Sequence, residues 1–203
     1  MGKLIAMVGN IGTGKTTLAL KLSATGSYTA LLEQHKERPF QKQFSTELQK
    51  FSLANQIDYM LFRAEQELYA RQNEVIAVQD GGLDQDFHVF TRLFRQKGYL
   101  DKEEFHLCER LYSTLRKVLP YPDLFIKLSA PKAILAQRWS KRKRGLDIAE
   151  ADDLDELEIL IQDWLPKMGA APIISLDTSK DDPSYESIID SLADTVSHIL
   201  KAC

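Results

Sequence analysis

The chain has 203 residues, a formal net charge of −3 at pH 7 and a calculated isoelectric point near 5.8. A chain of this length can bury a substantial core as one domain. Its mildly acidic balance argues against a protein that binds nucleic acid or an anionic membrane through bulk charge. We therefore expect one domain over residues 1–203, with neither nucleic acid nor a membrane as a partner.

Signals for export, membrane insertion or cross-linking are also scarce. The apolar runs stay well short of the roughly 20 residues that a membrane-spanning helix needs. The glycines between Gly9 and Gly14 interrupt any signal-peptide core. The two cysteines, Cys108 and Cys203, form neither a metal-ligand spacing nor a disulfide framework. These features predict a reducing, cytoplasmic setting.

The first predicted element is a strand over the apolar residues 4–8, followed by a glycine-rich segment and the helix-forming residues 18–20. This order gives the strand, G-x-x-x-x-G-K-[ST], helix context of a phosphate-binding loop. Glycines allow successive N–H groups to face one point, and the helix that follows adds its positive dipole end. We expect Lys15 to reach the β- and γ-phosphates of ATP and Thr16 to bind Mg²⁺. The predicted nucleotide-binding residues are Gly9, Asn10, Ile11, Gly12, Thr13, Gly14, Lys15, Thr16 and Thr17.

Four further apolar runs are typical of buried strands, and longer stretches with helical periodicity separate them. The strands are expected at residues 28–32, 75–79, 124–128 and 173–176. The helices are expected at residues 51–71, 85–97, 102–118 and 184–201. This alternation predicts an α/β fold in which a five-stranded parallel sheet is flanked by helices on both faces. Ligands of such a sheet bind at the carboxyl ends of its strands.

Two carboxylates belong to this ligand-binding edge because each follows a predicted strand. Glu33 comes after the second strand, where it can accept a proton from a substrate hydroxyl as general base. Its position alone fits a solvated loop glutamate equally well. Asp80 ends the third strand, the usual place for an acid that organises Mg²⁺ beside a phosphate loop. We predict Thr16 and Asp80 as the metal-side residues.

Two pairs of side chains are candidates for recognising the acceptor. Gln56 and Arg63 lie two helical turns apart on one face. A glutamine amide both donates and accepts, which suits the edge of a nucleobase, although the sequence alone favours a polar face of a surface helix. Asp86 and Phe90 share a face of the next helix. Core packing explains Phe90 as well as base stacking does.

A basic cluster at residues 138–144 precedes an acidic stretch at residues 147–158. One interpretation is a nucleic-acid patch. In a phosphoryl-transfer protein, a mobile lid that neutralises charge in the transition state is the favoured interpretation. We predict this arginine-rich lid over about residues 138–153. Its candidate residues are Arg138 and Arg142 for catalysis and Arg144 for nucleotide binding.

Over roughly residues 4–147 the chain resembles the deoxynucleoside kinase family. The loop at residues 9–17 is similar to the family's G-N-I-G-[ST]-G-K-[ST]-[ST], and Glu33 matches the family's catalytic base. The resemblance implies a P-loop NTPase fold, ATP and Mg²⁺, a deoxynucleoside acceptor and a homodimer. The positions that match acceptor-contacting residues are Gln56, Arg63, Asp86, Phe90 and, near an acid that contacts the sugar 3′-hydroxyl, Asp147. Arg138, Arg142 and Arg144 resemble the lid pattern R-x-x-x-R-G-R.

The chain departs from the family pattern beside Asp80, where Gly81 and Gly82 replace the arginine and serine of [DE]-R-S. That arginine helps to hold the acceptor oxygen in the family. Two explanations remain open: the lid arginines with Lys36 or Arg38 compensate, or the acceptor is not a standard deoxynucleoside. If Gly81 does not need a positive φ angle, Gly81→Arg is expected to accelerate phosphorylation of standard deoxynucleosides.

These observations predict an ATP-dependent kinase that transfers the γ-phosphoryl group to the 5′-hydroxyl of a deoxynucleoside. A kinase of another small hydroxylated metabolite is the alternative enzyme. A nucleotide-binding regulatory protein that has lost catalysis is the alternative from a different functional class. Acceptor-dependent release of ADP distinguishes the three.

Overall fold

The structure is a computed structural model that describes residues 2–34, 38–141, 151–169, 171–180 and 185–202. Five parallel strands form one sheet in the order β2-β3-β1-β4-β5. The strands are β1 (Lys3–Gly9), β2 (Thr29–Leu31), β3 (Ile76–Asp80), β4 (Leu124–Ser129) and β5 (Ile173–Asp177). The predicted α/β fold with a five-stranded parallel sheet is confirmed.

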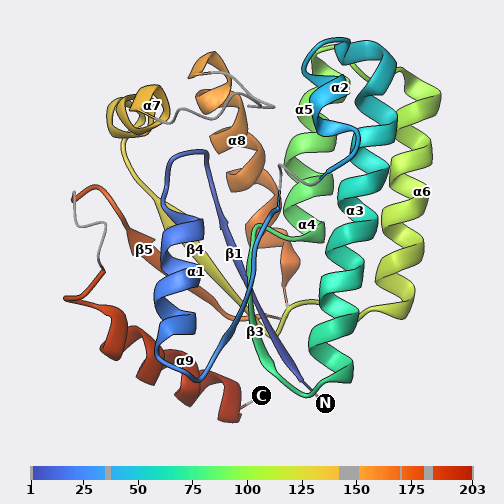
Figure 1. The fold of residues 1–203 in the computed structure, drawn as a ribbon. Coiled ribbons are helices and arrows are strands. Elements are labelled where there is room, and N and C mark those ends of the chain that lie inside the picture. Colours follow the sequence, from blue (N-terminus) through green and yellow to red (C-terminus); the bar gives the residue numbers. More distant parts are fainter. Residues whose placement is uncertain (1, 35–37, 142–150, 170, 181–184, 203) are drawn as a thin grey trace.

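Helices cover both faces of the sheet (Figure 1). One face carries α1 (Lys15–Ala24) and α9 (Ile189–Ala202). The helices on the other face include α3 (Leu48–Gln72), α4 (Leu83–Gln85), α5 (Arg92–Gln96), α6 (Lys102–Val118) and α8 (Leu154–Trp164). Shorter elements are α2 (Gln41–Phe44), the π-helical turn η2 (Asp86–Thr91), α7 (Lys132–Lys141), and the 3₁₀ turns η3 (Ala151–Asp153) and η4 (Leu165–Met168).

The alternation of side chains along β1 divides the core into two layers. Ile5 and Met7 pack with residues of α1 and α9, whereas Ala6 and Val8 pack with residues of α3 and α8. Successive side chains of a strand point to opposite faces, so a strand covered on both sides must be apolar throughout. This explains why the central strands are continuous apolar runs.

The predicted elements have observed counterparts that differ clearly at two places, and the helices α7 and α8 were not among those predicted. The helix expected over residues 85–97 consists of α4, the π-helical turn η2 and α5. Within η2, the Thr91 hydroxyl donates to the Asp86 carbonyl, five residues back, at 2.9 Å. The final helix, expected from residue 184, begins at Ile189. None of the described helices has both the length and the apolar character that crossing a bilayer requires.

The strand order determines which loops can meet. Because β3 lies between β2 and β1, the segments that follow these three strands are neighbours at one edge of the sheet. The Gly81 N–H donates to the Met7 carbonyl at 3.0 Å, which joins the end of β3 to the strand that leads into the glycine-rich loop. Glu33, Asp80 and the predicted phosphate loop therefore share this edge.

Candidate active site

The glycine-rich loop between β1 and α1 has the backbone that its glycines predict. Gly9 has φ +153° and Gly14 has φ +94°, in a region that residues with a side chain rarely occupy. A Cβ on Gly9 would lie 2.4 Å from the Leu128 carbonyl oxygen, and one on Gly14 would lie 2.3 Å from the Tyr185 hydroxyl. Backbone therefore leaves no space for a side chain at Gly9, a Cβ at Gly14 would require Tyr185 to move, and the φ angle favours glycine at both positions.

Lys15 opens α1 and folds back over this loop. Its Nζ donates to the carbonyl oxygens of Gly9 at 2.8 Å and Asn10 at 3.0 Å. The ammonium group is consequently held on the concave side of the loop, where the loop N–H groups and the helix N-terminus attract an anion. This arrangement suits a nucleoside triphosphate.

Thr16 and Asp80 come together at the end of β3. The Thr16 hydroxyl donates to Asp80 Oδ2 at 2.5 Å, although 64 residues separate the two in sequence. A hydroxyl and a carboxylate are oxygen ligands of the kind that Mg²⁺ takes along with phosphate oxygens and water. The described residues include no cluster of three or more His, Cys, Asp or Glu side chains that could hold a metal. The pair fits a Mg²⁺ ion that the nucleotide helps to hold.

Gln85 holds the start of the loop, a role that sequence reasoning missed because no local pattern signals it. The Gly9 N–H donates to Gln85 Oε1 at 3.0 Å, and Gln85 Nε2 donates to the Gly9 carbonyl at 3.1 Å. The Gln85 side chain is buried. One amide thus satisfies both backbone groups of Gly9. It also links the loop to α4, on the face of the sheet that α3 covers and that carries the residues predicted to recognise the acceptor (below, the acceptor side).

A buried ion pair forms the centre of the acceptor side. Arg63 Nε donates to Asp86 Oδ2 at 3.0 Å, and Arg63 Nη1 donates to Gln66 Oε1 at 3.3 Å. Burial raises the pKa of Asp86 to about 6, because it outweighs the opposing effect of Arg63. Burial also acts to lower the pKa of Arg63, but the carboxylates of Asp86, Glu33 and Asp80 outweigh it and raise that pKa. The guanidinium is therefore charged.

Gln56 and Phe90 come from the same two elements as this pair, α3 and η2. Gln56 is 2% exposed, so the alternative that it belongs to a surface face of the helix is wrong. Its Oε1 accepts a hydrogen bond from Thr91 Oγ1 at 2.8 Å, and its Nε2 has no acceptor among the described residues. Phe90 is partly buried and packs against the core on the α3 side of the sheet, so both interpretations of its role stay open.

Tyr59 is a second residue that sequence reasoning missed. It lies on α3 between Gln56 and Arg63, is buried, and its hydroxyl has no hydrogen-bond partner among the described residues. Burial raises its pKa, and the negative charge of Glu33 adds to this effect. The hydroxyl is therefore a protonated donor near the acceptor-side carboxylates. A signal was present in the sequence, since the residue continues the Gln56 face of the helix.

Glu33 lies two residues beyond β2 and is partly buried. Of the two nearby cations expected to compensate for Gly81, Lys36 lies outside the described residues. Arg38 pairs with Asp58 at 3.6 Å and stacks over the Phe62 ring, 4.0 Å from its centroid. These contacts direct the charge of Arg38 toward α3.

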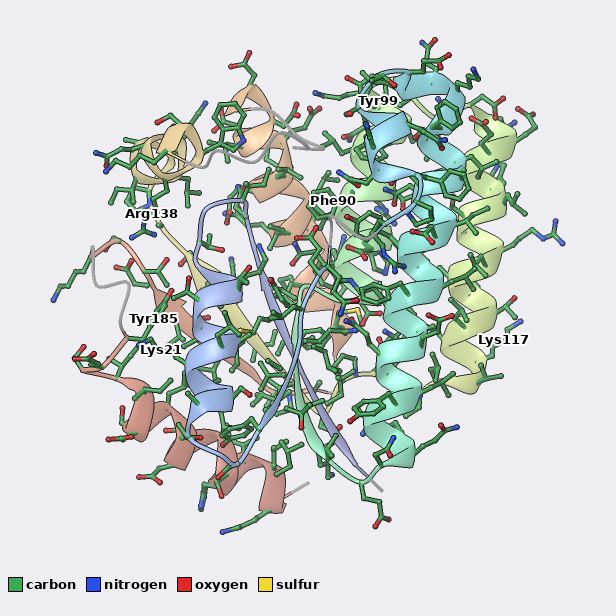
Figure 2. All side chains as sticks on the ribbon, viewed as in Figure 1. Lys21, Phe90, Tyr99, Lys117, Arg138 and Tyr185 are labelled. Atoms are coloured by element: carbon green, nitrogen blue, oxygen red, sulfur yellow. The ribbon has the colours of Figure 1, made fainter. Side chains whose placement is uncertain are left out.

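Arg138 connects the loop with the segment after β5. Its guanidinium donates to three carbonyl oxygens: Thr178 at 2.7 Å, Lys180 at 3.2 Å and Gly12 at 3.4 Å. Figure 2 shows Arg138 and Tyr185 on the α1 side of the sheet and Phe90 on the side of α3 and α5. The remaining predicted lid residues and the sugar-side acid, Arg142, Arg144 and Asp147, lie outside the described residues.

Comparison with known proteins identifies the family of this fold and site. The model of the deoxynucleoside kinase family matches residues 5–201. The chain belongs to the deoxynucleoside kinase family. This kinase is a phosphotransferase with a hydroxyl acceptor, and neither an unrelated metabolite kinase nor a non-catalytic nucleotide-binding protein is favoured.

Curated relatives and a solved structure agree with this assignment. A deoxyadenosine/deoxycytidine kinase of Bacillus subtilis is 22% identical over 201 residues, which cover 95% of the kinase and 93% of the relative. A deoxyguanosine kinase of the same organism is 25% identical, covering 79% of the kinase and 75% of the relative. The structure of a deoxyadenosine kinase from M. mycoides with dCMP and dCDP bound has the same fold, with a TM-score of 0.79 at 20% identity. That comparison covers 98% of the kinase and 100% of the other chain.

The glycine beside Asp80 is constrained in this kinase. Gly81 has φ +86°, and a Cβ there would lie 3.1 Å from Arg63 Nη2. Gly81→Arg was expected to accelerate phosphorylation only if Gly81 does not need a positive φ angle, and this condition is not met. We now expect Gly81→Arg to strain the backbone and displace Arg63.

Proposed function

We propose that the kinase transfers the γ-phosphoryl group of ATP to the 5′-hydroxyl of a deoxynucleoside, assisted by Mg²⁺. One observation carries the proposal. The loop that holds Lys15 and the Thr16–Asp80 pair adjoins, at the same edge of the sheet, the segment with Glu33 and the buried Arg63–Asp86 pair. The first group suits a triphosphate, and the second group offers a base and hydrogen-bonding groups to an acceptor.

The division of labour follows from the chemistry of phosphoryl transfer. A carboxylate oxygen of Glu33 takes the proton of the 5′-hydroxyl. As it does so, the 5′-oxygen forms a bond to the γ-phosphorus and the bond between that phosphorus and ADP breaks. Lys15 and the loop N–H groups neutralise the phosphate oxygens. Thr16 and Asp80 would hold Mg²⁺, which supplies further neutralisation of the phosphates when bound. Arg138, Arg142 and Arg144 are proposed to close over the nucleotide.

The acceptor pocket favours a base with complementary donors and acceptors. Gln56 Nε2, Tyr59 Oη and Asp86 offer polar groups in a buried setting. Buried polar groups left unpaired penalise the wrong ligand. Because the curated relatives are named as kinases of deoxyadenosine, deoxycytidine and deoxyguanosine, we propose that this kinase prefers one of these three over thymidine.

The test is ATP-dependent phosphorylation of the four deoxynucleosides, measured by ADP release and by appearance of the monophosphate. Lys15→Ala is expected to stay folded and to lose about 10²–10³ in turnover, because a preorganised charge on the phosphates is removed. Lys21→Ala, on the same helix but beyond the loop, is the matched control. Near-normal turnover by folded Lys15→Ala, or thymidine as the best substrate, would contradict the corresponding part of the proposal.

Two further expectations belong to the same proposal. A homodimer is expected from the family resemblance, and light scattering on the purified protein measures it directly. A cytoplasmic location is expected from the sparse cysteines, of which Cys108 is a free, buried thiol whose pKa burial raises to about 12.

A further inference from the structure

The guanidinium of Arg63 fills the space that a side chain at position 81 would enter. A Cβ built on Gly81 would lie 3.1 Å from Arg63 Nη2 and 3.7 Å from Arg63 Cζ. Arg63 comes from the middle of α3, whereas Gly81 directly follows Asp80 at the end of β3. The absence of a side chain at residue 81 therefore lets the Arg63 guanidinium lie against the backbone at the carboxyl end of β3 without being displaced.

Two sides of the Arg63 guanidinium are anchored, and these anchors determine where its remaining nitrogen lies. Nε is held by Asp86 and Nη1 by Gln66. Gln66 is held in turn by Gln79 Nε2 at 3.0 Å. Among the described residues, the side-chain hydrogen bonds of this guanidinium run through Nε and Nη1, and Nη2 is the nitrogen that lies over Gly81. A planar guanidinium that is fixed at two nitrogens holds the third as an oriented donor. The side chain therefore loses little conformational entropy when that nitrogen forms a hydrogen bond.

The surroundings of Arg63 are those of the phosphoryl-transfer site. Burial works against its charge, but Asp86, Glu33 and Asp80 together sustain that charge. Two of these three carboxylates are the proposed base and the proposed metal-side acid. A fixed cation whose Nη2 lies over Gly81, directly after Asp80, is well placed for an oxygen that becomes negative as it gives up its proton.

We propose that Arg63 is a catalytic residue whose Nη2 donates to the attacking 5′-oxygen, in addition to holding Asp86. This inference rests on the proposed function. It differs from a role confined to the base, since an interaction with the 5′-oxygen is the same for every deoxynucleoside. Removing it should lower kcat for all acceptors alike, whereas a base contact should raise KM for some acceptors only.

The first experiment compares Arg63→Lys and Arg63→Gln with the unaltered kinase on deoxyadenosine and deoxycytidine. ATP binding, measured by calorimetry, gives the concentration of folded sites for each variant. Per folded site, Arg63→Gln is expected to lose about 10²–10³ in kcat on both acceptors, as for loss of one preorganised donor. Arg63→Lys keeps the positive charge but lacks the planar guanidinium with its fixed donors. Its kcat is expected to lie between those of Arg63→Gln and the unaltered kinase. A loss confined to KM, or to one base, would overturn the proposal.

A second experiment leaves Arg63 in place and displaces it slightly. The Cβ of Gly81→Ala would force Nη2 to shift by a few tenths of an ångström, and the expected cost is about tenfold in kcat with a smaller change in KM. Gly26→Ala is the matched control, because Gly26 has φ +84° but its Cβ would meet nothing within 4 Å. Both variants carry similar backbone strain, so equal kinetics for the two would overturn the proposal.

Failure of the proposed function gives a different result from failure of this inference. If the unaltered kinase phosphorylates no deoxynucleoside, the proposed function is wrong. If the unaltered kinase is active and Gly81→Ala matches Gly26→Ala, only the role of Arg63 is wrong. If Arg63→Gln does not bind ATP, the comparison of Gly81→Ala with Gly26→Ala decides the question without that variant.

Discussion

At the scale of single residues, the site depends on side chains that hold other groups in place. Lys15 covers the loop carbonyls, Thr16 meets Asp80, and Gln85 bonds both backbone groups of Gly9. In phosphoryl transfer there is little covalent chemistry for a protein to perform, so positioning and charge supply most of the rate. Conservative substitutions in the site should therefore show, by their separate effects on kcat, KM and ATP affinity, which residues act in binding and which in turnover.

Glu33→Gln tests the general base. The amide keeps the size and polarity of the carboxylate but has no useful proton affinity, so we expect kcat to fall by about 10²–10⁴ while KM changes much less. Steady-state kinetics on the best deoxynucleoside measures both. If the loss were confined to KM, Glu33 would be a binding residue.

Gln85→Glu tests the clamp on the loop. The carboxylate still accepts from the Gly9 N–H, but it cannot donate to the Gly9 carbonyl and brings a negative charge next to the phosphates. We expect ATP affinity to fall by about tenfold to a hundredfold, as for loss of a buried hydrogen bond, with little change in the KM of the nucleoside. Gln96→Glu, at the exposed end of α5, is the control. Unchanged ATP affinity measured by calorimetry would show that the loop does not need the clamp.

At the scale of elements, the π-helical turn η2 joins two environments. It directs Asp86 toward the acceptor side and His88 toward an aromatic cluster, where the His88 ring stacks on Trp164 at 5.4 Å between centroids. The Tyr112 hydroxyl donates to Asp84 at 2.8 Å, so its oxygen accepts from His88 Nε2 at 3.0 Å. A wide turn of this kind often marks a functional site.

His88 should make the kinase less stable at acid pH. Burial lowers the pKa of His88 to about 4, and Arg92 and Arg116 act in the same direction against Asp163. Between pH 6.5 and about 4 the unfolded chain binds a proton that the folded chain does not, so the free energy of unfolding falls as the pH falls. The slope for this one group is at most about 1.4 kcal/mol per pH unit.

The contribution of His88 is measured as a difference between proteins. Urea unfolding of the unaltered kinase and of His88→Phe is compared at several pH values, since the buried carboxylates contribute equally to both. The stability advantage of the unaltered protein should shrink from pH 7 toward pH 4.5. His106→Phe, which removes an exposed imidazole, serves as the control. If the difference in the free energy of unfolding between the unaltered kinase and His88→Phe did not vary with pH, burial would not lower the pKa of His88.

At the scale of the whole molecule, one sheet shares its two faces between two apolar layers. Leu192 of α9 belongs to the layer with α1, and Leu160 of α8 belongs to the layer on the opposite face. Both layers are anchored on the same central strands, so neither can open without exposing the other side of β1. We therefore expect residues 1–203 to unfold as one cooperative domain.

Leu192→Ala and Leu160→Ala test this expectation from opposite faces. Each should lower the free energy of unfolding by about 2–5 kcal/mol, because a buried leucine leaves a cavity. Leu20→Ala, at a position that is 49% exposed, should have little effect. Circular dichroism and tryptophan fluorescence should report one shared transition for each variant. Separate transitions, each moved by only one of the two substitutions, would indicate two domains.

Local patterns were sufficient to predict much of this molecule. The glycine-rich loop was predictable because all its parts are contiguous and each acts through its own backbone geometry. The strands were predictable because burial on two faces demands continuous apolar runs. The positions of Glu33 and Asp80 at strand ends then followed from the rule for parallel sheets. Helix ends such as the start of α9 were less predictable, since tertiary packing decides them.

The sequence by itself determined the fold class, the phosphate loop and the kind of chemistry, because these depend on patterns within short stretches of chain. Only the tertiary structure decided that Gln85 clamps Gly9 and that Arg63 occupies the space above Gly81. These contacts join residues far apart in the chain, and the strand order β2-β3-β1 brings them together. Strand order comes from the total burial of both faces of the sheet, a property that no local stretch of residues carries.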